Sequence, residues 1–218
     1  MDLRAIAAVA ALLLAGNSWA EGSLGVKAGT LGFGVEASWR LTPKLGVRGG
    51  FNQFDYDFDD DVDGVTYQGD LELGSAALLG DVRPWAGGFR LTAGAIVNDN
   101  RIAAVADPAA TYEIGNRVYT QEEAGVLSAE SDFDTLAPYL GIGYDFGLGR
   151  RLSLALDLGV LFQGDPDVAI ASTGGTLSDD PTLRADLAAE EQSFRDDLEG
   201  FDLYPVLSIG LAWNLGKR

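Results

Sequence analysis

Strict alternation near the end of the chain limits the possible folds more than any other feature of the sequence. The residues at every second position from 203 to 215 are apolar: Leu203, Pro205, Leu207, Ile209, Leu211, Trp213 and Leu215. The residues between them are mostly small or polar. Because successive side chains of a β-strand point to opposite faces, this period of two predicts a strand with one apolar face and one face suited to a narrow interior.

The same alternation recurs in segments that short turns join into pairs. It changes phase at Gly29–Gly32, where a one-residue slip would turn every side chain to the other face, so a tight turn or a bulge must lie there. Counting the segments before and after that point separately predicts eight strands. Short turns alternate with long polar segments, as in outer-membrane barrels, and an even strand number leaves both chain ends on the periplasmic side. The remaining predicted strands cover residues 45–58, 65–79, 89–97, 136–146, 152–162 and 203–215.

Aromatic residues gather at the two ends of the predicted strands, which is typical of the two interfaces of a membrane. One group lies near the short turns and includes Trp39, Trp85 and Trp213, whereas Phe54 and Tyr204 belong to the group near the long segments. The alternative is a soluble, lipocalin-like barrel, in which these rings would crowd a narrow interior. We therefore predict an all-β fold, an eight-stranded antiparallel transmembrane β-barrel.

Acidic residues are concentrated in three long polar segments. Residues 55–70 carry seven acids and no base, residues 107–134 seven acids and one base, and residues 165–200 ten acids and two bases. The formal net charge of the chain is −18, so the predicted strands are nearly neutral and the external segments strongly acidic. This balance argues against nucleic acid as a partner.

The start of the chain is typical of a secretory signal peptide over residues 1–20. Arg4 precedes an apolar run, and Ser18–Ala20 forms a small-x-small cleavage pattern. The alternative, a transmembrane helix, needs a longer apolar stretch. We expect residues 21–218 to form one outer-membrane barrel domain, and the absence of Cys leaves no disulfide framework.

The last strand resembles the C-terminal assembly signal of bacterial outer-membrane barrels at Ser208, Gly210, Trp213 and Leu215. That signal usually ends the chain on an aromatic residue, whereas three residues follow Leu215 here. The resemblance implies the barrel assembly machinery as a partner, and outer-membrane lipid with lipopolysaccharide as the surroundings.

A second resemblance lies at residues 27–36, KAGTLGFGVE. This run, the Asp-rich segment and the closing strand are similar to a family of uncharacterised proteobacterial outer-membrane barrels, in the size class of OmpX and OmpW. The family carries no assigned activity, so the resemblance implies the fold and the bacterial outer membrane alone. The oligomeric state stays open.

Charged residues at inward positions form a second predicted feature. If the large apolar residues face lipid, the interior holds three acids and three bases: Lys27, Glu36, Arg48, Glu72, Arg90 and Asp157. Eight strands leave an interior just wide enough for side chains to fill it. We expect these residues to pair as salt bridges that close the interior. The alternative is a path for protons or small ions along the charges.

The chain contains no His, and this absence excludes several kinds of barrel enzyme. Outer-membrane acyltransferases, lipid A deacylases, phospholipases and omptin-like proteases use a catalytic His. We therefore predict no catalytic residue, and a non-enzymatic barrel with a structural or surface-binding role. The alternative function is a narrow channel for small or apolar solutes.

Two external segments carry further patterns. Carboxylates at Asp59, Asp61, Asp63 and Asp70, with a glycine at position 64, follow the spacing of a calcium-binding loop, although that loop normally ends in Glu and lies between helices. A solvated acidic loop without any cofactor is the alternative to calcium binding.

The pattern of residues 180–198 predicts a helix that begins near Asp180 and ends before Gly200. We expect this helix to pack on the barrel rim or over its mouth; the alternative is a lid that binds a partner or ligand.

Overall fold

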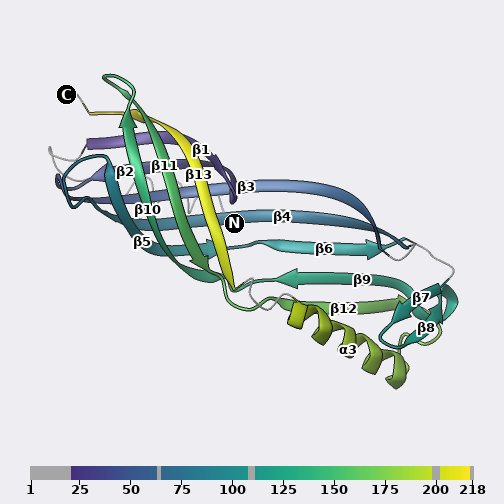
Figure 1. The fold of residues 1–218 in the computed structure, drawn as a ribbon. Coiled ribbons are helices and arrows are strands. Elements are labelled where there is room, and N and C mark those ends of the chain that lie inside the picture. The colour runs from purple at the N-terminus through teal and green to yellow at the C-terminus, as the bar shows by residue number, and fades with distance from the viewer. Residues whose placement is uncertain (1–20, 63–64, 108–110, 198–201, 217–218) are drawn as a thin grey trace.

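Eight antiparallel strands close into a barrel in the computed structural model, which describes residues 21–62, 65–107, 111–197 and 202–216 (Figure 1). Pairing of β1 with β13 and of β4 with β5 closes the cylinder. The predicted eight-stranded barrel is confirmed, whereas the proposed signal peptide lies outside the described residues. The barrel strands are β1 (Glu21–Gly29), β2 (Gly32–Arg40), β3 (Leu45–Val62), β4 (Val65–Val82), β5 (Phe89–Asn98), β10 (Leu136–Gly147), β11 (Leu152–Phe162) and β13 (Leu203–Asn214).

The predicted hairpin at the start of the barrel is present. β1 and β2 pair from Glu21↔Arg40 to Gly29↔Gly32, and only residues 30 and 31 connect them. Gly32 has a φ of +90°, and a Cβ at this position would lie 2.6 Å from Cβ of Phe54. A glycine is therefore required both by the backbone and by the close approach of β3.

Alternation along the strands separates a lipid-facing exterior from a buried interior. On β13, Leu207 is 53% exposed while its neighbour Val206 is 6% exposed. The same contrast holds on β10, where Leu140 is exposed and Tyr139 is buried. An exposed apolar band around a closed barrel is the surface that a bilayer covers.

Among the described residues, no helix is both long enough and apolar enough to cross a bilayer.

The sheet continues beyond the barrel on one side. β3 and β4 are 18 residues long each, and their outer parts join three further strands, β6 (Arg101–Ala106), β9 (Gly125–Asp132) and β12 (Asp167–Gly174). We call this part, with residues 54–62 of β3 and 65–73 of β4, the extension; it projects away from the short turns (Figure 1). We took residues 107–134 and 165–200, which contain β9 and β12, as long polar segments, and we predicted no strand at β6 just before the first of them. All three strands were missed because each is short and its partners are distant in the chain.

The far end of the extension carries a small lobe with its own core. The lobe contains β7 (Thr111–Ile114), β8 (Arg117–Thr120), α2 (Gln121–Ala124) and α3 (Pro181–Asp197). Helix α3 confirms the helix predicted in the last external segment. It packs along β12 of the extension and against β7 of the lobe, rather than as a cap on the barrel rim. The buried core of the lobe comprises Ala106, Tyr112, Ile114, Tyr119, Ala124, Leu127, Leu183 and Leu187.

Candidate functional site

The barrel interior contains a buried cation that three carboxylates surround. Arg48, on β3, is 4% exposed, and its Nε lies 2.9 Å from a carboxylate oxygen of Asp81 on β4. Its two terminal nitrogens lie 3.1 Å from Glu36 of β2 and 3.1 Å from Asp157 of β11. Four strands therefore meet at one guanidinium, because inward positions at the same height of a barrel converge on the axis.

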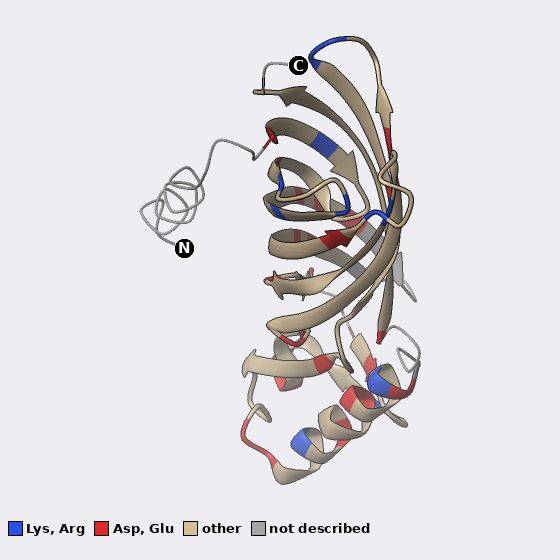
Figure 2. Cartoon of the chain, turned by 90° about the vertical axis from the view of Figure 1, so that its left-hand side faces the viewer, with Lys and Arg blue, Asp and Glu red and all other residues tan. Residues whose placement is uncertain are grey.

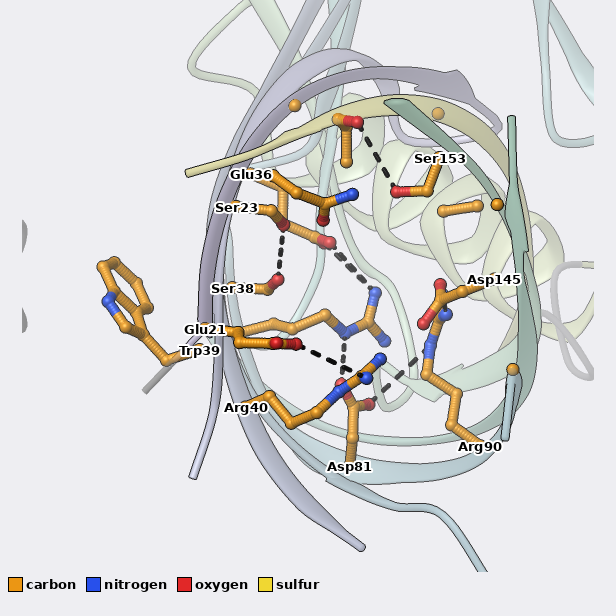
Figure 3. A pocket seen from close by; sticks show the side chains of 18 of the residues that line it. Glu21, Ser23, Glu36, Ser38, Trp39, Arg40, Asp81, Arg90, Asp145 and Ser153 are labelled. Carbon is orange, nitrogen blue, oxygen red and sulfur yellow. Dashed lines mark hydrogen bonds and ion pairs between the residues drawn. The ribbon is translucent and has the colours of Figure 1, made fainter. Parts of the chain in front are cut away.

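A second guanidinium extends this network across the barrel. Arg90 of β5 is 1% exposed, lies 2.8 Å from Asp157, and also pairs with Asp145 of β10. Asp145 in turn accepts a hydrogen bond of 2.9 Å from Arg83. Figure 3 shows Asp81, Arg90 and Asp145 pointing into the same cavity, whereas Trp39 points away from it. The two arginines thus share one connected set of carboxylates.

Five of the six interior residues predicted from the sequence lie in this network. Lys27 joins through Glu36, at 3.2 Å between its Nζ and a carboxylate oxygen. The assignment of Glu72 was wrong: it is exposed on the extension, where it pairs in register with Asp55 and Arg101.

The error at Glu72 has a physical cause in β4. We took Leu79 and the apolar residues in phase with it as lipid-facing, which turned Glu72 inward. In the structure Leu79 is 6% exposed inside the barrel and Leu78 is 63% exposed outside. Both faces of this strand are apolar at that height, so alternation alone does not tell them apart.

Three members of the network were not predicted from the sequence. Asp81 shares its face of β4 with Leu79, which we took as lipid-facing. Asp145 and Arg83 lie at or near the short turns. Alternation along β10 could have placed Asp145 inside the barrel, because it is in phase with the inward residues Tyr139, Gly141 and Gly143.

A cavity of about 310 Å³ lies between the network and the short-turn end of the barrel. Charged and small polar side chains line it, and the floor is formed by Arg48, Arg90 and their carboxylate partners. One hydrogen bond of 2.7 Å joins the Oγ atoms of Ser23 and Ser38 across its wall. This cavity, which we call the vestibule, is visible in Figure 3.

Beyond the network the interior is filled. The ring of Tyr139 occupies space that two glycines leave free, since a Cβ on Gly141 or Gly159 would lie 2.4 Å from its hydroxyl oxygen. Past this ring, buried apolar side chains continue toward the end of the barrel that carries the extension. Leu161, which is 0% exposed, is one of them. The interior therefore consists of a vestibule, a layer of ion pairs and a mainly apolar filling that also buries the hydrogen-bonded pair Asn52 and Ser75. We call this filling the apolar plug.

The barrel was compared with protein-family models, curated proteins and solved structures. Neither a protein-family model nor a curated protein matches the chain. Among solved structures, CarO2 of Acinetobacter baumannii matches with a TM-score of 0.59 and 26% identity, over 91% of this chain and 100% of that one. CarO of the same species matches with a TM-score of 0.59 and 24% identity, again over 91% and 100%. This chain is a small outer-membrane β-barrel protein.

Acidic residues of this outer-membrane barrel gather on the extension and the lobe, away from the short turns (Figure 2). Asp59 lies opposite Gln68, and Asp70 lies opposite Asp57, so the described part of the Asp-rich segment forms a continuous hairpin. Asp63 and the side chain of Asp61 fall outside the described residues. Calcium binding by this segment stays a prediction.

The residues of the proposed assembly signal lie on or just after β13. Ser208 and Gly210 are on the interior face, while Trp213 and Leu215 are 51% and 54% exposed on the lipid-facing side. This placement leaves two large apolar side chains at the membrane surface of the closing strand. Recognition by the barrel assembly machinery stays a prediction.

Proposed function

We propose that this protein is a closed, non-enzymatic anchor in the outer membrane that holds an acidic sheet at the cell surface, in a structural or binding role. One observation carries the proposal: β3 and β4 run without interruption from the filled barrel into the extension. A continuous hairpin transmits the rigidity of the barrel to the external sheet, whereas a filled interior contributes nothing to the passage of solutes.

The filling of the barrel supports the closed state. Arg48 and Arg90 are both held by two or more carboxylates, so moving either side chain would leave buried charge without a partner. Tyr139 and the apolar plug lie behind them. The absence of His from the chain supports a non-enzymatic role. Outer-membrane lipid and lipopolysaccharide are the expected surroundings.

The second candidate is the narrow channel for small or apolar solutes. The vestibule favours it, because a polar cavity already penetrates the barrel from the short-turn end. A solute would then have to displace Tyr139 and the ion pairs to continue.

Planar-bilayer recording separates the two candidates. We expect the purified, refolded protein to give no conductance steps, and we expect Tyr139→Ala combined with Leu161→Ala to give openings, since both side chains fill the plug. A second pair of variants tests the ion pairs. Arg90→Ala removes a buried member of the network, and Arg101→Ala is its matched control because Arg101 is exposed on the extension. Steps in the unmodified protein that change with Arg90→Ala but not with Arg101→Ala would establish the channel and refute the closed anchor.

A further inference from the structure

The two edge strands of the extension, β12 and β3, differ in whether side chains cover their outward backbone groups. At the β12 edge, helix α3 occupies the outward backbone groups: the Ile170 amide donates to Glu191 at 2.8 Å, and Arg195 donates to the Val168 carbonyl at 2.6 Å. Side chains that occupy these groups prevent another strand from pairing there.

The opposite edge, on β3, has no such cover in the described part of the chain. Pairing of β3 with β2 ends at Phe33↔Gln53, and β3 continues to Val62 with only β4 beside it. Residues 54–62 therefore present one row of backbone donors and acceptors to solvent. An extended, uncovered strand edge is a template for an added strand.

The two faces of this open edge differ in chemistry. Phe54, Tyr56 and Phe58 form a ladder on one face, with centroid separations of 6.3 and 6.4 Å and interplanar angles of 11° and 12°. Tyr56 is 55% exposed, and the ring of Phe58 lies over Gly69 of β4. An aromatic ladder with one open flank offers apolar contact to side chains at alternate positions of an added strand.

The other face carries exposed Asp55, Asp57 and Asp59. Asp55 lies opposite Glu72, and Asp57 lies opposite Asp70, so two like-charged pairs oppose each other across the hairpin. Like charges in this position are destabilising. Arg101 of β6 already lies opposite Glu72 on its other side. A basic side chain on a strand added at the β3 edge would relieve the repulsion on the side of the Asp residues.

We infer that the open β3 edge binds an extended basic segment of a partner protein by strand addition, with Lys or Arg alternating with apolar residues. The basic residues face the row of Asp, and the apolar residues face the aromatic ladder. A second copy of this chain is the wrong occupant, because two β3 edges would bring Asp rows together. The inference rests on the proposed surface-binding role and names the class of partner.

The test uses the refolded full-length barrel in detergent and a short fluorescent peptide of alternating Lys and Val, with binding followed by anisotropy. We expect saturable binding, and a loss of about tenfold in affinity on Asp55→Asn with Asp57→Asn, since paired charges across an interface are removed. The matched control is Glu113→Gln with Asp196→Asn, which removes the same charge from exposed sites on β7 and α3 and is expected to leave the affinity unchanged.

A second peptide separates strand addition from attraction by charge alone. Methylation of the amides along one edge of the Lys–Val peptide keeps its charge but removes its donors, so we expect binding to fall by about tenfold or more. Equal binding of both peptides, equal effects of the two double variants, or no binding at all would each overturn the inference. Conductance is measured separately, so failure of the closed-anchor proposal is distinguishable from failure of peptide binding.

Discussion

Arg48 shows how a single residue organises the barrel interior. Its guanidinium is almost fully buried and contacts carboxylates from three other strands. Removing a charge from water is costly, and the ion pairs offset that cost only while each partner is present. The network therefore makes the strands interdependent.

We expect Arg48→Met to destabilise the barrel by about 3–5 kcal/mol, because Glu36, Asp81 and Asp157 would lose a shared buried partner. Urea unfolding of the refolded protein in lipid vesicles measures this change. Arg101→Met is the control: its ion pair with Glu130 is exposed, so a change below about 1 kcal/mol is expected. Equal effects of both substitutions would show that the buried network is not the source of stability.

At the scale of the element, helix α3 begins at a side-chain cap. The carboxylate of Asp180 accepts a hydrogen bond of 2.7 Å from the backbone amide of Thr182, and Pro181 occupies the first helical position. This bond satisfies an amide that has no partner within the helix. It is also the main reason that the pKa of Asp180 lies below its usual value.

The lowered pKa of Asp180 makes the start of α3 sensitive to acid. A depressed carboxyl pKa contributes stability that is fully present above the unfolded value of about 3.9 and is lost as the pH falls through the folded pKa. We expect hydrogen-exchange protection of the first turn of α3 to decline over that window. Asp180→Asn keeps a capping side chain but does not titrate, so an unchanged decline in this variant would contradict the assignment.

The whole molecule contains two separate buried apolar clusters within its described residues. One fills the barrel beside the ion pairs, and the other holds α3, β7 and β8 at the far end of the extension. They share none of their buried residues. The barrel and the lobe should therefore lose structure independently.

We expect Leu183→Ala with Leu187→Ala to expose the lobe to protease while the barrel still migrates as a folded species in unheated gels. Each substitution in a buried cluster costs about 2–5 kcal/mol, and both leucines belong to the lobe. Leu161→Ala is the reciprocal control, because it opens a cavity in the barrel and leaves the lobe core intact. Loss of gel migration in the lobe variant would show one cooperative unit instead.

The sequence by itself determined the strands of the barrel, their number and the membrane that surrounds them. The period of two along β13 and the phase change at Gly29–Gly32 are local properties, because successive side chains of a strand must point to opposite faces. The convergence of Lys27, Glu36, Arg48, Arg90 and Asp157 followed from those phases.

Only the tertiary structure decided which face of β4 points inward and where the acidic segments go. Leu78 and Leu79 are equally apolar, so the register with β3 and β5, not composition, places Asp81 inside and Glu72 outside. Likewise β6, β9 and β12 become strands because the long β4 offers β6 an edge, onto which β9 and then β12 add. Pairing between distant segments depends on neighbours that no local pattern specifies, and this is why the extension and its open edge appear only in the folded chain.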